Sequence, residues 1–398
     1  MRPQKLLAPI LLIAFLHAAA TASIAVVEVL YLRHTLQASY TMIGSVLGAA
    51  AVGYLLFAPF LKELPKAIGR GVYLSWTSFI LAVATIFAAN ITNAGMYLVS
   101  KSLILLLAPI TFSTLISFIE DELRYNADLQ KCYAALTLAA MTGGIIGFLA
   151  AGNIAINTYA HAYILSTATF LLAGFIGLSL PQSTQPIRNK PTLNLVERLE
   201  TAFSKKHQTI TIIVLATNAY WALRDITIPL LLIQQGYTTA TIGGLFAIAA
   251  FMGVISSAVT RILLRKNHPE RVMVAALAIA SIASIILPFG GLIVLGVLYA
   301  IYISAEVALT PAISDRVEEV SSKATPYITS LATASALAWT ITPWIAGVLL
   351  EAGISYQALL FLGGILIVAA YWRAKQTYTP NDYFPRISIK KNKKKLTW

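Results

Sequence analysis

Five charged residues interrupt stretches of the sequence that are otherwise apolar: Glu28, Lys101, Arg224, Asp225 and Glu306. The run 208–233 is long enough to cross a bilayer as a helix, yet Arg224 and Asp225 lie well inside it. A charge at that depth costs roughly 2.5–3.5 kcal/mol on insertion scales, and it is tolerated where the group faces a partner or a water-filled cavity. We therefore expect the helix 208–233 to line a cavity through a membrane.

The first apolar run places His17, Thr21 and Glu28 on one helical face. Histidine titrates near neutral pH, and both His17 and Glu28 are candidates to carry a coupling proton. The alternatives are that His17 only packs and that Glu28 reaches the membrane surface. Lys101 lies at a similar depth in the fourth run, where it can pair with Glu28 and close the outer mouth, or extend to the interface.

In the run 208–233, Asn218, Trp221 and Asp225 are spaced i, i+3 and i+7 and form one stripe. Arg224 is rotated by about 100° from Asp225, so we expect the two charges to have different partners. Trp221 and Tyr220 suit stacking against a flat or cationic solute. The alternative is a structural Arg–Asp network that braces the helix.

The run 291–313 carries a second polar stripe, in which Tyr299, Tyr302, Glu306 and Thr310 follow at i, i+3, i+7 and i+11. Glu306 is too deep in this run to reach the membrane surface easily. Glu306 and Asp225 are the strongest candidates for binding a proton or a substrate cation, with a purely structural role as the alternative.

The composition indicates a membrane protein, because 58% of the 398 residues are hydrophobic and only 11% are charged. Twelve apolar runs have roughly the length of a spanning helix: 6–32, 41–61, 72–89, 96–118, 132–155, 161–180, 208–233, 240–263, 271–289, 291–313, 325–350 and 355–373. The expected fold is therefore an all-α polytopic membrane protein. With Cys132 as the one cysteine, no phosphate-binding glycine loop and no metal-spaced cluster, we expect neither an enzyme nor a cofactor.

The distribution of basic residues predicts on which side of the membrane the termini lie. All 29 Lys and Arg residues except Arg33, Lys101 and Arg224 fall on the side that holds both termini, which the positive-inside rule assigns to the cytoplasm. The excess of positive residues, a net charge of +13, then lies on the cytoplasmic side of the membrane and does not indicate nucleic-acid binding. The basic run 390–395 in the tail 374–398 is expected to touch anionic lipid headgroups. We expect a cytoplasmic (plasma) membrane protein that acts as a monomer.

The linker 181–207 separates an N-terminal unit, 1–180, from a C-terminal unit, 208–373. Its second part predicts an amphipathic helix on the inner membrane surface, with an apolar face made of Leu193, Leu195, Val196, Leu199 and Phe203. Polar residues surround that face: Glu197, Arg198, Glu200, Lys205 and Lys206. A plain flexible connector is the alternative.

An internal repeat relates the two units at a constant offset of 199 residues. Ile43-Gly44 aligns with Ile242-Gly243, and the basic residues that follow those runs align as well: Lys62 and Lys66 with Arg261 and Arg265. Glu120 and Arg124 align with Glu319 and Lys323, and 143–147 with 342–346. Two parallel six-helix repeats joined by a cytoplasmic linker are typical of transporters whose site lies between the halves.

On the helix count, the repeat and the linker, nearly the whole chain resembles the major facilitator superfamily. Of that family's signature after the second span, the segment 62–70 keeps Gly69-Arg70, but Lys62 and Lys66 replace its first glycine and its aspartate. In the fifth span, the glycines at 143, 144 and 147 resemble the pattern of drug exporters without its proline. The resemblance implies that spans one, four, seven and ten line a central cavity, and these four carry the embedded charges.

We therefore expect a secondary transporter that moves a small solute by alternating access and is coupled to protons, with an efflux antiporter as one form that it can take. The small-residue spacing of the fifth and eleventh spans, such as Gly143 to Gly147, lets helices approach closely, and it predicts either packing alone or surfaces at which the halves slide. One alternative function is a lipid or amphiphile flippase on the same scaffold. Another is a sensor or scaffold that binds a partner through the tail 390–395.

Overall fold

The computed structural model describes residues 3–61, 64–123, 129–181, 194–205, 207–320 and 324–378, and these residues form helices joined by short connections. The first half contains α1 (Pro3–Leu30) with a π-turn η1 (Tyr31–Thr35), α2 (Tyr40–Leu61), the short α3 (Leu64–Ile68), α4 (Arg70–Ala89), α5 (Ala94–Leu123), α6 (Leu129–Ile154) and α7 (Ala160–Leu178). The run 390–395 and the basic positions 62, 124 and 323 lie outside the described residues.

The linker helix α8 (Leu195–Phe203) leads into the second half. That half contains α9 (Gln208–Gln234), α10 (Thr239–Lys266), α11 (Pro269–Ile286) with a 3₁₀ turn η2 (Leu287–Phe289), α12 (Leu292–Val320), α13 (Ala324–Glu351) and α14 (Tyr356–Tyr378). Each of the twelve predicted runs is matched by one long helix. Among the described residues, eleven of these helices are long and apolar enough to cross a membrane, and α9, with its charged pair, is the other.

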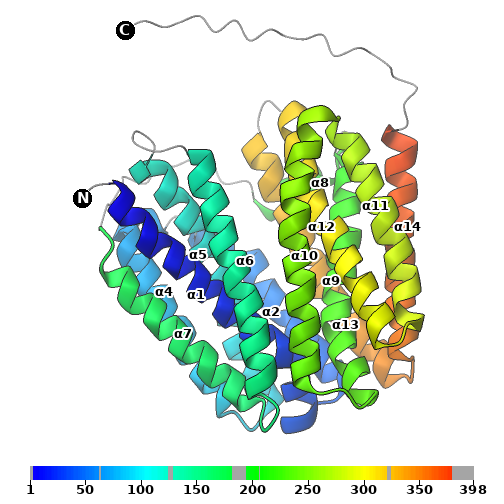
Figure 1. Ribbon diagram of the computed structural model, residues 1–398, viewed down its shortest axis with the longest axis horizontal. Coiled ribbons are helices and arrows are strands. Elements are labelled where there is room, and N and C mark those ends of the chain that lie inside the picture. Colours follow the sequence, from blue (N-terminus) through cyan, green and yellow to red (C-terminus); the bar gives the residue numbers. More distant parts are fainter. Residues whose placement is uncertain are drawn as a thin grey trace, which may run out of the picture.

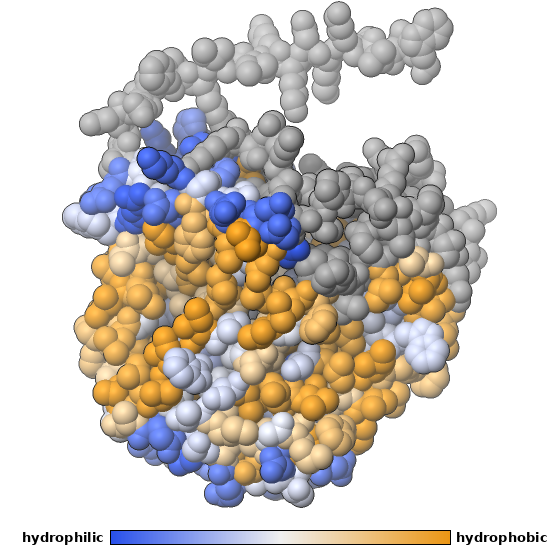
Figure 2. Space-filling model, turned by 180° about the vertical axis from the view of Figure 1, so that it is seen from behind, coloured by the Kyte–Doolittle hydropathy of each residue, from blue (hydrophilic) through white to orange (hydrophobic). Residues whose placement is uncertain are grey.

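The outer surface of the bundle explains why the chain needs a bilayer. Large apolar side chains such as Trp76, Phe175 and Ile293 are more than half exposed. Figure 2 shows such residues covering the middle of the molecule, with hydrophilic residues gathered at both ends. The arrangement confirms a multi-pass, all-α membrane protein.

The long helices form two bundles that lie side by side (Figure 1). In the first, α1 packs against α6 and α7, and α4 packs against α7. In the second, α12 packs against α10 and α11, and α9 packs against α14. The bundles meet mainly through two helix pairs, α2 with α13 and α6 with α10, and α1 also contacts α9 and α10. They diverge toward the end that holds the N-terminus, which we call the terminal face, and approach at the opposite end, the far face (Figure 1).

Glycines allow the two bundles to approach closely near the far face. A side chain at Gly44 in α2 would collide with the backbone carbonyl of Pro343 in α13. At its repeat position, Gly243 in α10 would collide in the same way with the carbonyl of Phe148 in α6. The sequence repeat therefore places equivalent glycines at equivalent contacts between the halves.

At Gly143 and Gly147 the structure contains close packing alone, and the prediction of a sliding surface between the halves is wrong for these two glycines. These glycines lie against the backbone of Phe15 and Ala19 in α1, so they join two helices of the same bundle. In α6, the glycine that contacts the other half is Gly152, which packs against Gly243. Helical spacing indicates that a neighbour comes close, but it does not identify that neighbour.

A polar clasp joins the bundles at the far face. The backbone N–H of Tyr40, the first residue of α2, donates to Oε2 of Glu351 at 2.8 Å, and the N–H of Thr41 lies 3.4 Å from the same oxygen. The Tyr40 and Tyr356 hydroxyls are 2.6 Å apart, and the Arg33 guanidinium lies 4.2 Å above the Tyr40 ring. Glu351 thus caps, from the other half, amides that α2 cannot satisfy itself.

The linker helix α8 has a strong start signal, because Asn194 and Glu197 form a reciprocal capping box. It packs against α13, with Arg198 and Ala202 buried and with Val196 and Phe203 exposed. Position 193, the first residue assigned to its apolar face, lies outside the described residues. An amphipathic helix is present, and its location on a membrane surface stays a prediction.

Candidate functional site

The five embedded charges lie on four helices: α1, α5, α9 and α12. In the second bundle, Arg224 from α9 contacts two carboxylates. Its Nε lies 3.4 Å from Oδ1 of Asp225, and its Nη1 lies 3.4 Å from Oε2 of Glu306 on α12. The side chain of Arg224 is almost completely buried, whereas that of Asp225 is 33% exposed. We call Arg224, Asp225 and Glu306 the acidic cluster.

The expectation that Arg224 and Asp225 have different partners is wrong. Adjacent residues on a helix do point about 100° apart at Cβ. The long arginine side chain bends back, however, and its Nε comes within ion-pair distance of the neighbouring carboxylate. The structure therefore joins Arg224, Asp225 and Glu306 in one group.

Aromatic rings enclose the guanidinium of Arg224. Its Cζ lies 5.2 Å from the ring centre of Trp221, 5.2 Å from that of Tyr299 and 5.6 Å from that of Tyr302. Rings at such distances attract a cation through their π faces. The two predicted stripes, on α9 and on α12, therefore meet around a single buried cation.

The hydrogen bonds of this cluster are incomplete. Nε and Nη1 of Arg224 are buried without a hydrogen-bond partner among the described residues, as are the hydroxyls of Tyr220 and Tyr302. The 3.4 Å ion pairs are longer than the 2.7–2.9 Å typical of charge-assisted hydrogen bonds. Buried donors without acceptors are costly, and here they surround the group that the sequence predicted as functional.

Asn218 binds the neighbouring helix α13. Its Oδ1 accepts hydrogen bonds from Ser335 Oγ at 2.7 Å and from Trp339 Nε1 at 3.2 Å. The Trp339 ring packs edge-on against Trp221, with 5.8 Å between ring centres. Trp339 therefore faces the site, whereas Trp344 on the same helix is largely exposed on the surface.

In the first bundle, Glu28 and Lys101 form a short ion pair between α1 and α5. Lys101 Nζ donates to Oε2 of Glu28 at 2.5 Å, and the Tyr97 hydroxyl donates to Oε1 at 2.9 Å. The Tyr97 hydroxyl also lies 2.7 Å from that of Tyr163 on α7. Both charged side chains are nearly buried, and neither extends to the surface. Because both helices belong to one bundle, the pair by itself does not bridge the halves.

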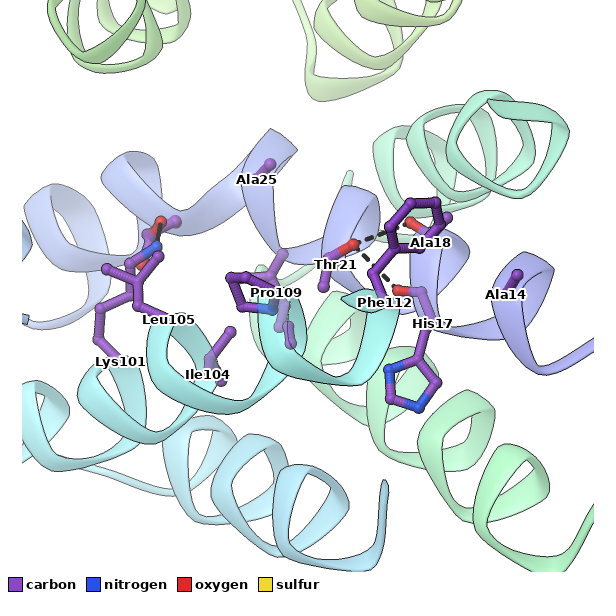
Figure 3. Close-up of a pocket in the computed structure, with 13 residues that line it drawn as sticks. Ala14, His17, Ala18, Thr21, Ala25, Lys101, Ile104, Leu105, Pro109 and Phe112 are labelled. Atoms are coloured by element: carbon purple, nitrogen blue, oxygen red, sulfur yellow. Dashed lines mark hydrogen bonds and ion pairs between the residues drawn. The ribbon is translucent and has the colours of Figure 1, made fainter. Parts of the chain in front are cut away.

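A cavity of about 360 Å³ lies between α1 and α5 (Figure 3). From α1 it is lined by Ala14, His17, Ala18, Thr21, Ile24, Ala25 and Glu28, and from α5 by Lys101, Ile104, Leu105, Ala108, Pro109 and Phe112. Figure 3 shows Lys101 and Leu105 toward one end and His17 and Phe112 toward the other. Its lining is mainly apolar. We call it the α1–α5 pocket.

His17 lies at the edge of this pocket but is held by the bundle interior. Its Nε2 is 2.7 Å from the hydroxyl of Ser78 on α4, and its ring packs edge-on against Phe170 on α7. The side chain is buried, and its Nδ1 has no partner among the described residues. The structure does not bring His17 into contact with the acidic cluster.

The two charged groups influence each other electrostatically across the contact between α1 and α9. The helices α1 and α9 are in contact, and Asp225 is within electrostatic range of Lys101 and Glu28. The five embedded charges therefore lie on the two sides of this contact: Glu28 and Lys101 in one bundle, and Arg224, Asp225 and Glu306 in the other.

Sequence reasoning missed Tyr97, Tyr163 and Ser335 as partners of the site. A signal existed for Tyr97, which precedes Lys101 by four residues and so shares its helical face. Tyr163 and Ser335 are in other helices, at positions where neither spacing nor polarity distinguishes them from packing residues.

The comparisons with known proteins agree with this architecture. The family model of the Major Facilitator Superfamily matches residues 10–325. No curated protein is similar enough in sequence to match. Among solved structures, a mutant form of the nucleoside transporter NupG has a TM-score of 0.81 at 14% identity, covering 94% of this chain and 100% of that one.

Two further structures are similar at the level of the fold. A bacterial homologue of the human lysosomal transporter Spinster, in an inward-facing and unoccupied conformation, has a TM-score of 0.73 at 14% identity, covering 94% of this chain and 97% of that one. The human organic anion transporter MFSD10 has a TM-score of 0.65 at 16% identity and covers 94% of this chain and 100% of its own. With the matched family model spanning most of its length, this chain belongs to the Major Facilitator Superfamily.

Proposed function

We propose that this protein is a proton-coupled secondary transporter that moves a small organic solute across the cytoplasmic membrane by alternating access. The observation that carries the proposal is that the Glu28–Lys101 pair of one bundle and the acidic cluster of the other both lie on helices beside the α1–α9 contact, in a molecule whose bundles are clasped at the far face and apart at the terminal face. Ionisable groups at membrane depth are retained where they bind solutes or ions.

The distribution of basic residues assigns the terminal face to the cytoplasm. In this orientation, the structure corresponds to an inward-facing state whose outer gate consists of the clasp at Glu351 and the glycine contacts. The outward-facing state then requires the bundles to rock apart at the far face and to close at the terminal face. One chain holds both bundles, so we expect a monomer to be the transport unit.

Spin-label distances test this mechanism before any substrate is known. In a Cys132→Ala background, one pair of cysteines replaces Lys131 on α6 and Arg265 on α10, at the terminal face. A second pair replaces Asn157 and Gln235 in far-face connections. Alternating access predicts two populations, in which one distance shortens where the other lengthens. A single distance at both faces under all conditions would contradict it.

The same measurement tests the coupling ion. If Asp225 and Glu306 bind the coupling proton, the ratio of the two populations changes with pH in the parent protein. It becomes independent of pH in the Asp225→Asn, Glu306→Gln double variant. Populations that follow pH equally in both proteins would remove these two acids from the coupling mechanism while leaving alternating access in place.

A lipid or amphiphile flippase is the second candidate, and the apolar lining of the α1–α5 pocket favours it. A flippase would move fluorescent lipids between the leaflets of reconstituted vesicles, which bleaching with an impermeant reductant detects. A transporter of small solutes would leave the lipids in place.

A further inference from the structure

The balance of charge around the central site restricts the solute. Lys101 is compensated by Glu28 at 2.5 Å, with no charge left over. In the acidic cluster, one guanidinium faces two carboxylates. The five groups in their ordinary ionisation states therefore leave one negative charge in excess, and a single positive charge on a ligand would balance it.

The surroundings of Arg224 show what kind of cation this site holds. The Arg224 guanidinium, a delocalised cation, lies 5.2–5.6 Å from the centres of three aromatic rings. It is beside two carboxylates to which it makes no hydrogen bond. Such a site stabilises a cation through its charge and through ring contacts and does not depend on directional hydrogen bonds. A ligand cation without N–H donors can use the same interactions.

Part of this site is accessible to a solute. The Asp225 side chain is 33% exposed and Trp221 is 41% exposed, whereas Arg224 is buried beneath them. Asp225 is also within electrostatic range of Glu28 and Lys101, which line the α1–α5 pocket. An approaching ligand therefore meets a carboxylate and an indole on one bundle and an apolar pocket on the other.

The α1–α5 pocket is large enough for the apolar part of a ligand. Its volume is about 360 Å³, whereas an apolar cavity of about 150 Å³ already holds a benzene molecule. Side chains such as Ile104, Leu105 and Phe112 offer apolar contacts and little hydrogen bonding. The pocket thus has room for about two aromatic rings or a branched alkyl group.

We infer that the transported solute is an amphipathic monovalent organic cation, whose charge lies against Asp225 and Trp221 and whose apolar group fills the α1–α5 pocket. This inference rests on the proposed transport function and names its substrate class. An organic anion is the competing solute, since Nε and Nη1 of Arg224 lack hydrogen-bond partners among the described residues. An anion at Arg224 would, however, lie beside two carboxylates, and the other cation of this site, Lys101, is already bound to Glu28.

The test uses binding of tetraphenylphosphonium, an aromatic monovalent cation, to the full-length purified protein in lipid nanodiscs. Two competitors separate the contributions of charge and apolar surface. Tetraphenylborate has nearly the same shape with a negative charge, and tetramethylammonium has the charge without the rings. We expect tetraphenylborate and tetramethylammonium each to compete at least tenfold more weakly than unlabelled tetraphenylphosphonium.

Two variants test the two parts of the site, each with a matched control. Asp225→Asn removes the accessible carboxylate, and Asp315→Asn removes an exposed carboxylate of α12 outside the site. Ala108→Leu fills the α1–α5 pocket, and Ala134→Leu adds the same bulk on an exposed position of α6. We expect at least tenfold weaker binding in the first member of each pair and less than twofold change in the second.

Equal competition by the borate ion, or tetraphenylphosphonium affinity that Asp225→Asn leaves unchanged, would overturn the assignment of a cationic solute. The outcome is separate from that of the proposed transport function. If the spin-label distances alternate while the phosphonium ion fails to bind, the chain is a transporter of another solute class. If the phosphonium ion binds and the spin-label distances stay fixed, the cation-binding site is supported and alternating access is contradicted.

Discussion

The two charged groups of the site differ in how completely they are satisfied. Glu28 receives Lys101 on one oxygen and the Tyr97 hydroxyl on the other, at 2.5 and 2.9 Å. Arg224 lies 3.4 Å from both of its carboxylates and leaves two buried nitrogens without hydrogen bonds among the described residues. A closed set of partners stabilises one arrangement, whereas an incomplete set leaves room for a ligand or a proton. We infer a structural role for the first group and an exchanging role for the second.

The largest expected effect is a loss of folding stability when the Glu28–Lys101 ion pair is broken. Lys101→Met leaves Glu28 buried with only Tyr97 as a partner, and removing one member of a buried ion pair costs about 3–5 kcal/mol of unfolding free energy. Reversible unfolding in mixed detergent micelles measures it. The Glu28→Gln, Lys101→Met double variant is the control, and it should recover much of the loss because no unpaired charge remains. Unchanged stability in Lys101→Met would remove the structural role.

A smaller loss of stability is expected from Arg224→Met, about 1–3 kcal/mol, the cost of leaving buried partners unsatisfied. The loss is smaller than for Lys101→Met because the ion pairs are long and because Asp225 reaches solvent. The same unfolding assay decides the order of the two variants. If Arg224→Met proves the more destabilising, the acidic cluster is the structural group and the comparison is reversed.

The smallest loss of stability is expected from Tyr97→Phe. This variant removes the hydroxyl that donates to Glu28 and leaves the Lys101–Glu28 contact in place. A single hydrogen bond contributes about 1 kcal/mol, or somewhat more when its acceptor is charged. Tyr302→Phe is the matched variant in the acidic cluster, where the hydroxyl has no partner among the described residues. It should cost less than Tyr97→Phe. Equal losses of stability in the two variants would mean that the two charged groups do not differ in how completely they are hydrogen-bonded.

Much of the fold could be predicted because membrane spans follow from the length of apolar runs. The predicted run 240–263 corresponds to α10 (Thr239–Lys266), and 208–233 to α9 (Gln208–Gln234). The helix ends extend beyond the apolar limits because polar residues also form helical turns, as Arg265 and Lys266 do in the last turn of α10. The repeat was detectable because Gly44 and Gly243 make equivalent close contacts with the other half.

The candidate site was less predictable, because the contacts of long side chains depend on packing between helices. The depths of Glu28 and Lys101 suggested their pairing, which the structure contains. The prediction that Arg224 and Asp225 have different partners was wrong, because helical angles give the direction of Cβ and not the position of the end of a flexible side chain. Spacing also gave no indication that His17 would be held by Ser78, since that hydroxyl belongs to another helix.

The capping of α2 by Glu351 has a consequence for how the far face opens. When the bundles separate there, the N–H groups of Tyr40 and Thr41 lose their carboxylate and need another acceptor. Water is the acceptor at hand, so hydration of the first turn of α2 must accompany the outward swing. The rate of that swing is therefore tied to water activity, and solutes excluded from protein surfaces are expected to slow it.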